Sequence, residues 1–329
     1  ESKSSIMLNR IKRIFVPQKR KTMLYKIKNK ELLNEHRNRF DKFYNKYIKL
    51  GNCKYNTESE LKENLPQYDI YMVGSDQMWN PYIKIRSNAF YLSFVPDDKI
   101  KVSYAPSIGG NYIAEKYQEE MKKYLSSFKY LSCRDHKGSE IISKALDREV
   151  TTVLDPTLLL DKNEWLKISN KVNGIEEKYI VCYFLGNKKC NIEYAEKLGK
   201  EKNMKVYYIY TLANDIVEGF NYLFDVGPQE FIWLLNNAEY VCTDSFHGTI
   251  FSMNFQKQFF SFTKRKDGEG SDNNRIYEVL KEFELEERFV SDSECNEIKD
   301  IKQINYERCQ AKLLEKIEKS KEYLNKIIK

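Results

Sequence analysis

The sequence predicts an α/β protein with two parallel-sheet domains, and two observations lead to this prediction. Short apolar runs of strand length alternate with helical patterns along the chain, which is typical of parallel strands joined by right-handed crossovers. A polar stretch at 162–178 separates two such series. With 329 residues the chain is long enough for two domains. We therefore expect two Rossmann-like domains that face each other across a cleft.

The expected elements follow one another regularly in both series. In the first series we expect strands at 68–73, 101–105, 130–133 and 150–154, and helices at 61–65, at 114–125 and through 141–142. In the second series we expect strands at 179–185, 206–210, 240–242 and 258–262, and helices at 191–202, 228–237 and 276–280. The chain should end in an amphipathic helix at 306–328.

These patterns divide the chain into four parts. Residues 1–65 form a basic helical segment that we assign to the first domain, and 66–165 form the body of that α/β domain. Residues 175–300 form the second α/β domain, and 301–329 form the C-terminal helix. The basic segment holds 17 Lys and Arg against 7 Asp and Glu, while the whole chain carries a net charge of +7. This segment is either a solvated helical face or a surface attracted to an anionic membrane or polymer.

Composition excludes several other classes of protein. The chain is 41% apolar and 31% charged, and no apolar run approaches the ~18 residues of a membrane span, so we expect a soluble, cytoplasmic protein. The seven cysteines include no C-x-x-C pair, which argues against disulfides and structural zinc. Three dispersed histidines make a poor metal site, and we expect no metal. No nucleic-acid-binding module is visible, so we expect no nucleic-acid partner.

The stretch 243–249 is the strongest candidate for chemistry, because it lies where a buried strand turns into a helix. In an open α/β sheet such a loop holds ligands, and the helix N-terminus attracts anions. Asp244 and Ser245 are good N-cap residues, and Gly248 lets backbone approach a ligand. His247 can exchange a proton near neutral pH. The alternative is a capped helix in which His247 only satisfies a carbonyl group.

Other polar loops follow strands in both halves, so their side chains should line the cleft between the halves. A polar loop at 74–81 follows the first strand, although a turn with Trp79 packed underneath would give the same pattern. Cations and a helix N-terminus would suit a small substrate with several negative charges. The candidates are Asp76, Gln77, Trp79, Asn80, Ser107 and Arg134 from the first half, and Asp244, Ser245, His247, Lys264, Arg265 and Arg275 from the second.

An ordered set of motifs carries a family resemblance over roughly residues 40–290. The motifs lie at 73–81, 103–109, 132–135, 153–159, 243–249 and 270–276. With them the chain resembles the polysaccharide pyruvyl transferase family. The resemblance implies a fold similar to the two-Rossmann type B glycosyltransferases. It also implies transfer of an enolpyruvyl unit from phosphoenolpyruvate to two sugar hydroxyls as a cyclic ketal, with release of phosphate.

The resemblance also implies roles for individual residues. Arg134 would grip the donor, His247 would bind the donor and transfer a proton, and the family's lysine would fall on Lys264 or Arg265. Asp76 is a candidate base, and Asp244 a candidate for orienting His247. We further expect Ser245, Gly248 and Arg275 at the donor, and Ser75, Gln77, Trp79, Asn80 and Ser107 at the acceptor, with Trp79 offering an apolar face to a pyranose ring.

Phosphoenolpyruvate would be a co-substrate, and we expect no cofactor. The acceptor would be a saccharide or a lipid-linked oligosaccharide, reached through peripheral contact of the basic N-terminal region with the inner face of the membrane. The resemblance implies two departures from the family pattern: we expect the first domain to lack its opening strand-helix unit, and Pro106 stands where a small residue is commoner. The alternatives are a nucleotide-sugar-dependent glycosyltransferase of the same fold, and a non-catalytic partner or fragment of a polysaccharide assembly system.

Overall fold

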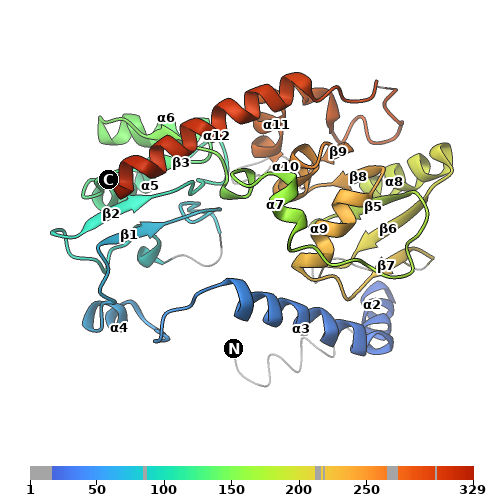
Figure 1. Cartoon of the computed structure of the whole chain (residues 1–329), viewed down its shortest axis with the longest axis horizontal. Coiled ribbons are helices and arrows are strands. Elements are labelled where there is room, and N and C mark those ends of the chain that lie inside the picture. Colours follow the sequence, from blue (N-terminus) through green and yellow to red (C-terminus); the bar gives the residue numbers. More distant parts are fainter. Residues whose placement is uncertain (1–16, 84–86, 212–215, 218, 265–272, 301) are drawn as a thin grey trace. The chain divides into compact units, whose positions relative to one another are not determined.

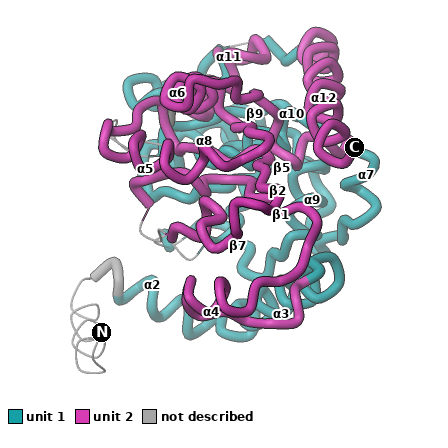
Figure 2. The backbone as a smooth tube through the Cα atoms, turned by 90° about the vertical axis from the view of Figure 1, so that its left-hand side faces the viewer, with its two compact units in different colours: residues 1–49, 162–264, 287–304 teal, residues 50–161, 265–286, 305–329 magenta. Residues whose placement is uncertain are grey.

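The chain forms two compact α/β units, which Figure 2 colours separately. The structure is a computed structural model that describes residues 17–83, 87–211, 216–217, 219–264, 273–300 and 302–329. Unit 1 comprises residues 1–49, 162–264 and 287–304, and unit 2 comprises residues 50–161, 265–286 and 305–329. The predicted α/β class with parallel sheets is confirmed, because every strand pairing in both units is parallel.

Unit 2 is built on short parallel strands. Strands β1 (Ile70–Val73) and β2 (Ile100–Ser103) pair with each other, as do β3 (Ser132–Cys133) and β4 (Thr151–Thr152). A parallel bridge between Val102 and Tyr130 joins the two pairs into one layer. The unit's helices are α4 (Glu58–Glu63), α5 (Glu115–Leu125), α6 (His136–Leu146), α11 (Asn273–Glu282) and α12 (Glu307–Ile328), with short 3-10 turns η1 (Asn88–Tyr91) and η2 (Pro156–Leu158).

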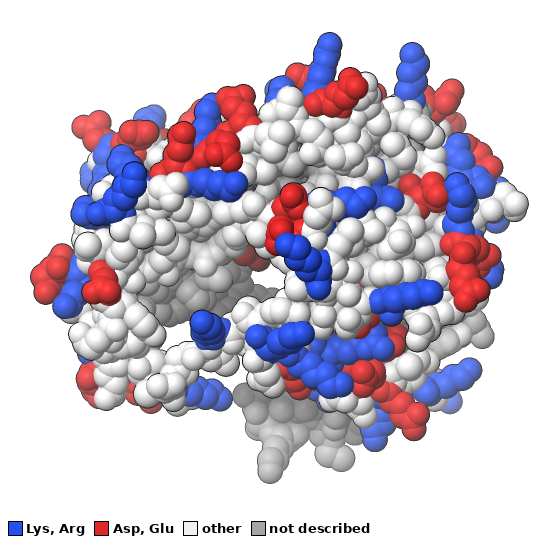
Figure 3. All heavy atoms as spheres, in the orientation of Figure 1, with Lys and Arg blue, Asp and Glu red and all other residues white. Residues whose placement is uncertain are grey.

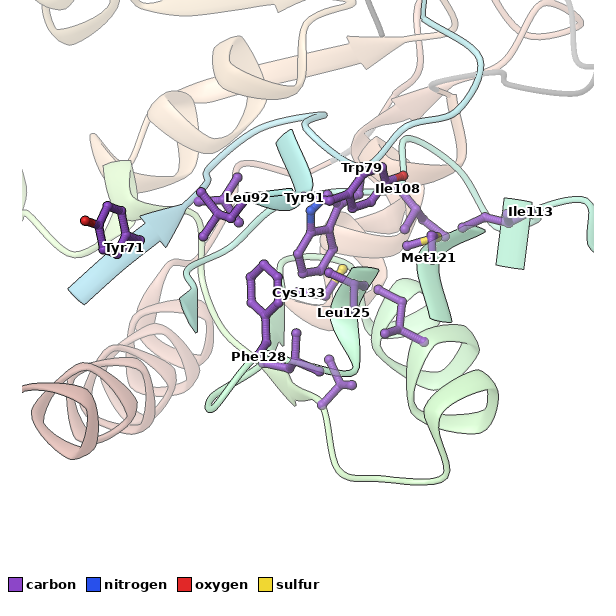
Figure 4. Close-up of a cluster of buried hydrophobic side chains, with 14 of the residues drawn as sticks. Tyr71, Trp79, Tyr91, Leu92, Ile108, Ile113, Met121, Leu125, Phe128 and Cys133 are labelled. Atoms are coloured by element: carbon purple, nitrogen blue, oxygen red, sulfur yellow. The ribbon is translucent and has the colours of Figure 1, made fainter. Parts of the chain in front are cut away.

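The main core of unit 2 gathers around Trp79. Its indole ring is fully buried, stacks on Tyr91 at 6.4 Å between ring centroids, and meets the edge of Phe128 at 6.3 Å. Figure 4 shows this cluster, into which Met121 and Leu125 point from α5. A second cluster, in which α12 residues pack on residues of β2 and its surroundings, includes Val102, Tyr104, Val153, Tyr323 and Ile327.

Unit 1 holds a six-stranded parallel sheet in the order β10-β9-β8-β5-β6-β7. The strands are β5 (Tyr179–Tyr183), β6 (Lys205–Ile209), β7 (Asn221–Leu223), β8 (Tyr240–Thr243), β9 (Gln258–Phe262) and β10 (Phe289–Val290). The central strand β5 is an apolar run that is buried on both faces, as expected for a sheet covered by helices on both sides. The order places β8 and its following loop next to β5.

Helices cover this sheet, and Figure 1 labels them. They are α2 (Pro17–Lys28), α3 (Lys30–Tyr47), α7 (Lys162–Leu166), α8 (Lys189–Lys202), α9 (Pro228–Asn237) and α10 (Phe246–Asn254), with a short turn η3 (Glu286–Arg288). The start of α9 follows the sequence closely: Pro228 opens the helix, and the Glu230 side chain accepts a hydrogen bond from the Gly227 amide at 3.1 Å.

The N-terminal helices correct one prediction. We assigned residues 1–65 to the first α/β domain, but α2 and α3 belong to unit 1. His36 Nδ1 lies 2.7 Å from the Val226 carbonyl oxygen, and Arg39 pairs with Asp225 at 2.8 Å and with Glu230 at 3.5 Å. These contacts tie α3 to the start of α9. Only the later part of the basic segment, with α4, belongs to unit 2.

The C-terminal helix corrects a second prediction. We expected residues 301–329 to form a separate part of the chain, but residues 305–329 belong to unit 2. The Ser320 hydroxyl accepts a hydrogen bond from the Leu154 amide at 3.0 Å, and the Tyr323 hydroxyl donates to the Ser103 carbonyl at 2.9 Å. Both contacts are buried, so α12 completes the core of unit 2.

Candidate functional site

Polar side chains meet at the carboxyl edge of the strands of unit 2. Asp76 follows β1, Ser107 follows β2, Arg134 follows β3 and Asp155 follows β4. Because all these strands are parallel, their carboxyl ends share one edge. A parallel bridge between Asp76 and Pro106 continues the pairing beyond β1 and β2, which places these loops side by side.

Arg134 is the centre of this edge. Its Nη1 donates to Asp155 Oδ2 at 2.6 Å and its Nη2 to Asp76 Oδ1 at 3.3 Å. The Arg134 side chain is only 3% exposed and that of Asp155 1%. Burial lowers the pKa of Arg134, but the carboxylates of Asp135, Asp155 and Asp76 outweigh it and hold the pKa above its ordinary value. Arg134 is therefore a charged guanidinium in a fixed orientation.

Asp76 links this ion pair to a second arginine. Its Oδ1 lies 3.9 Å from Arg275 Nη1, and its side chain is 53% exposed. Arg275 comes from the first turn of α11, which belongs to unit 2. We expected Arg275 in the second half, and the structure instead joins it to the loop after β1. The exposed carboxylate thus lies between two guanidinium groups.

Trp79 is not available to a ligand, which corrects its predicted role at the acceptor. The indole is fully buried in the core, and its Nε1 donates to the Phe90 carbonyl at 3.1 Å. The alternative considered above, a turn with Trp79 packed underneath, is the correct one. A polar loop after a strand does not reveal which of its side chains turns inward.

The other predicted acceptor residues divide into buried and partly exposed groups. Ser107 is fully buried, and its hydroxyl accepts from the Gly109 amide at 3.0 Å, so its role is to shape the loop. Asn80 is 4% exposed, donates to Gln77 Oε1 at 2.5 Å and accepts from the Tyr82 amide at 2.9 Å. Ser75 and Gln77 are half-buried.

Asp155 is a site residue that sequence reasoning did not select. It lies in the motif at 153–159, directly after β4, as Arg134 lies directly after β3. Its Oδ1 accepts hydrogen bonds from the Thr157 amide at 3.1 Å and from the Thr157 hydroxyl at 2.7 Å. The sequence could have indicated Asp155 as a site residue, because it follows strand β4 as Arg134 follows the neighbouring strand β3.

His247 lies in unit 1, in the first turn of α10. It is the one side chain between Val241 and Ile250 that is partly exposed, since its neighbours in this stretch are buried. Its ring meets Phe246 edge-on, with 5.7 Å between ring centroids. The start of a helix that follows β8 therefore presents an imidazole at the carboxyl edge of the sheet.

Ser245 and Gly248 build this turn and are themselves buried. The Ser245 hydroxyl caps α10 by accepting from the Gly248 amide at 3.3 Å. A Cβ atom on Gly248 would lie 2.2 Å from Thr243 Oγ1, so close packing requires the glycine here. Thr243 Oγ1 in turn donates to the Tyr183 carbonyl at 2.7 Å. That backbone at Gly248 approaches a ligand stays a prediction.

Asp244 holds the neighbouring loop in place. Its two carboxylate oxygens accept hydrogen bonds from the Leu185 amide at 2.6 Å and the Gly186 amide at 2.9 Å, directly after β5. Burial raises the pKa of Asp244, while these amides and the charge of Lys264 oppose that rise. Lys264 follows β9 and lies against Gly186, so it belongs to the same edge as His247. That Asp244 orients His247 stays a prediction.

A second lysine, Lys188, was missed by the sequence reasoning. Its Nζ donates to Thr263 Oγ1 at 2.8 Å and pairs with Asp292. It lies in the loop after β5, which the sequence had left without a candidate. Arg265 lies outside the described residues. The shared cleft expected for His247 and Arg134 stays a prediction.

The described residues contain neither a candidate metal site nor a candidate membrane span. Within the part of the chain that the structure describes, no three His, Cys, Asp or Glu side chains are grouped so that they would hold a metal ion. No helix among those residues has both the length and the apolar character that a membrane crossing requires.

Comparisons with known proteins give a family and several distant structures. The family model described as "Polysaccharide pyruvyl transferase" matches residues 8–263. None of the curated proteins matches the chain.

Three of the solved structures that match the chain are similar to it at low sequence identity. UDP-GlcNAc 2-epimerase from Neisseria meningitidis is 13% identical, with 87% of this chain and 90% of that chain covered and a TM-score of 0.49. The S. aureus MnaA-UDP structure is 15% identical, with 75% and 78% covered and a TM-score of 0.46. The wall teichoic acid polymerase TagF is 13% identical, with 94% and 99% covered and a TM-score of 0.37.

Proposed function

Since the chain belongs to the polysaccharide pyruvyl transferase family, we propose that it moves an enolpyruvyl unit from phosphoenolpyruvate onto two hydroxyls of a cell-surface polysaccharide or its precursor. The product is a cyclic pyruvate ketal, and phosphate is released. The observation that carries the proposal is the family match over residues 8–263, within which Asp76, Arg134, Asp155 and His247 lie at the carboxyl edges of parallel sheets. No cofactor is needed for this reaction.

The proposed reaction balances without an oxidant or reductant. One sugar hydroxyl loses its proton to a base and adds to C2 of phosphoenolpyruvate, while an acid delivers a proton to the methylene carbon, which becomes a methyl group. The second hydroxyl then attacks C2, its proton is removed, and the C2–O bond to phosphate breaks. The enzyme must therefore hold a carboxylate and a phosphate, supply one proton and accept two.

We assign the donor to the cationic side chains and the imidazole. In unit 2, Arg134 and Arg275 are the guanidinium groups beside the exposed Asp76 carboxylate. An anionic donor would replace Asp76 as their partner, which its exposure allows. In unit 1, His247 is the proton-transferring group, and Lys264 or Arg265 is the phosphate ligand. Asp76, released from the arginines, is the candidate base for the acceptor hydroxyl.

Phosphate release from phosphoenolpyruvate tests the proposal. The wild-type protein should release phosphate only when a galactoside or N-acetylhexosamine acceptor is present. His247→Ala should lower kcat by roughly 10²- to 10⁴-fold, the range of general acid–base catalysis. Arg134→Lys keeps the positive charge but removes the planar guanidinium group that contacts Asp155 and Asp76 through two separate nitrogens. This variant should lower kcat/KM by at least ~100-fold.

Matched controls keep this test specific. His136→Ala and Arg308→Lys replace the same residue types at positions that are 72% and 89% exposed, and both should leave turnover unchanged. Thermal unfolding of every variant must show a folded protein. Wild-type turnover of UDP-N-acetylglucosamine with no reaction of phosphoenolpyruvate would favour the glycosyltransferase alternative instead.

We further propose that helices α2 and α3 bring the enzyme to the inner face of the membrane, where a lipid-linked acceptor would lie. Residues 20–49 contain ten Lys or Arg and three Asp or Glu. Figure 3 shows Lys and Arg gathered near α3. Exposed apolar side chains accompany them, which suits an anionic lipid surface. These are Met23, Leu24 and Ile27 on α2, and Leu32, Phe40 and Tyr44 on α3.

Sedimentation with lipid vesicles tests this contact. Binding to vesicles with phosphatidylglycerol should exceed binding to pure phosphatidylcholine vesicles, and Lys42→Glu with Lys46→Glu should weaken it at least ~10-fold, at ~1 kcal/mol for each basic residue. The control pair Lys319→Glu with Lys321→Glu, on α12, should bind normally. Equal binding to both vesicle types would remove the membrane from the proposal.

A further inference from the structure

Three polar side chains meet at the carboxyl edge of the sheet of unit 1. They are Lys188 from the loop after β5, Thr263 directly after β9, and Asp292 from the turn after β10. Lys188 Nζ donates to Thr263 Oγ1 at 2.8 Å and pairs with Asp292, and the Thr263 hydroxyl donates to the same carboxylate. We call this group the Lys188 cluster. None of the roles assigned above uses it.

The lysine is held from beneath by buried groups. Thr263 is buried, and its carbonyl accepts a hydrogen bond at 3.2 Å from the side-chain amide of Asn191, which is buried in the first turn of α8. The Lys188 side chain is itself only 17% exposed. Its ammonium group therefore keeps a defined position at the edge of the sheet.

The cluster lies beside the loops that carry the predicted donor residues of unit 1. The order of the sheet places β8, which precedes His247, between β5 and β9. Asp244, from the same turn as His247, accepts a hydrogen bond at 2.9 Å from the Gly186 amide, two residues before Lys188. A Cβ atom on Gly186 would lie 2.9 Å from the Lys264 carbonyl oxygen. The loops after β5, β8 and β9 are therefore in contact.

Asp292 is the member of the cluster that an anionic ligand can replace. Its side chain is 51% exposed, and an ion pair with such an exposed partner contributes little net stability. A phosphate group carries more charge than one carboxylate and offers more acceptor oxygens to the ammonium group. The arrangement resembles that of Arg134 and Asp76 in unit 2, where a mostly buried cation also holds an exposed carboxylate at the carboxyl edge of a sheet.

We propose that Lys188 is a phosphate ligand, and that its ammonium group binds the phosphate of the donor in place of Asp292. Lysine suits this role because its ammonium group is a compact charge with three N–H donors, one of which Thr263 holds in position. Negative charge grows on the phosphate as the C2–O bond breaks, and Lys188 stabilises that charge. Naming the donor as phosphoenolpyruvate rests on the proposed function. The binding of a phosphate group rests on the Lys188 cluster alone.

Isothermal titration calorimetry with inorganic phosphate and with phosphoenolpyruvate, without an acceptor, tests this proposal. Lys188→Gln should weaken the binding of both at least ~10-fold, the order of loss for one charge-assisted hydrogen bond, and Lys188→Arg should restore part of it. The control Lys189→Gln changes the next residue, whose side chain is 88% exposed, and should bind both anions as the wild type does. Thermal unfolding must show that each variant is folded.

The variant Asp292→Asn separates a ligand role for Lys188 from a purely structural ion pair. If the carboxylate competes with phosphate for the ammonium group, its removal should tighten phosphate binding at least ~3-fold. The same change should have much less effect when it is made together with Lys188→Gln, because the group for which the two anions compete is then absent. A structural ion pair gives no such coupling.

Each outcome decides the proposal. Wild-type phosphate binding by a folded Lys188→Gln variant, equal effects of Asp292→Asn with and without Lys188, or no saturable binding of either anion would overturn it. If phosphoenolpyruvate binds through Lys188 but no acceptor supports phosphate release, the Lys188 assignment stands and the pyruvyl transfer proposal fails. If Lys188→Gln keeps the wild-type KM for phosphoenolpyruvate in phosphate release, the Lys188 assignment fails while the transferase stands.

Discussion

At the scale of single residues, Gly248 decides whether the loop that carries His247 keeps its shape. A methyl group at this position would meet Thr243 Oγ1 at 2.2 Å, and that hydroxyl is already engaged with the Tyr183 carbonyl and the Ser245 amide. We expect Gly248→Ala to lower the free energy of unfolding by about 1 to 3 kcal/mol, as overpacking in a close-packed interior does. Chemical denaturation of the purified variant measures this change.

The control is Gly51→Ala, where an added Cβ meets nothing within 4 Å. It should change the free energy of unfolding by no more than about 0.5 kcal/mol. A Gly248→Ala variant as stable as Gly51→Ala would show that Thr243 can move away, and the loop would then be softer than its contacts indicate.

The pattern of residue types predicted which residues follow a strand better than it predicted which side chains turn into the core. Arg134, His247 and Asp76 lie after strands, as the alternation of apolar runs and polar loops predicted. Trp79 lies in the loop after β1 and Gly248 in the first turn of α10, and both are buried. Which side of a loop is buried depends on packing partners such as Phe128 and Thr243, and a local pattern does not contain that information.

At the scale of elements, the turn after β10 depends on one carboxylate. Glu294 Oε2 accepts from the Ser291 hydroxyl at 2.5 Å and from the Ser291 amide at 3.0 Å, and Oε1 lies 2.9 Å from Lys299 Nζ. The hydrogen bonds from Ser291, assisted by Lys299, lower the pKa of Glu294 from 4.5 to about 2. The ionised form is therefore the one that the folded turn prefers.

This shift gives a pH dependence of known sign. Because the folded pKa is depressed, the contribution of Glu294 is present above about pH 5 and is lost as the pH falls from 4.5 towards 2. Glu294→Gln should cost about 1 kcal/mol at pH 7, since the side chain is 45% exposed and screened, and less as the pH falls. Urea denaturation of both proteins at several pH values measures the difference. Glu297→Gln, an exposed neighbour, should show no such trend, and a constant cost for Glu294→Gln would contradict the assignment.

The longer apolar strands were predictable, and two short edge strands were not. Strand β9 has the predicted bounds, and β5, β6 and β8 differ from theirs by one or two residues. Strands β7 and β10 were missed, because they have only three and two residues, too few to form a recognisable apolar run. They are strands because they extend the edges of a sheet that is already formed.

At the scale of the whole molecule, the chain returns to each unit after leaving it. Residues 1–49 fold with 162–264, and residues 305–329 fold with 50–161. Sequence order suggested that the basic helices would stay with the domain that follows them. The contacts that decide otherwise, such as Arg39 with Asp225, join residues that are far apart in the chain. Periodicity identifies the buried face of a helix but does not identify the sheet against which it packs.

Helix α12 contributes to a buried cluster of unit 2, although it lies far along the sequence from most of that unit. Its Tyr323 and Ile327 pack with Val102 and Val153, and Ser320 and Tyr323 satisfy backbone groups at Leu154 and Ser103. Removing residues 306–329 would expose this cluster and leave the buried Leu154 amide without the Ser320 hydroxyl, at about 1 to 3 kcal/mol, while the Ser103 carbonyl would keep the Ser132 hydroxyl as a donor. We expect amide hydrogen exchange in the truncated protein to accelerate in β1–β4 of unit 2, while β5, β8 and β9 of unit 1 stay protected.

The single substitution Tyr323→Phe tests one of these contacts more mildly than the truncation does. It removes one hydroxyl and should destabilise the protein by about 0.5 to 1.5 kcal/mol without changing the fold, because the Ser103 carbonyl loses one buried donor and keeps the Ser132 hydroxyl, at 2.8 Å. If truncation accelerates exchange equally in both sheets, the two units unfold as one, and the division of the chain into separately stabilised units is wrong. If it accelerates exchange in neither, the contacts of α12 with β2 and Leu154 contribute little to unit 2.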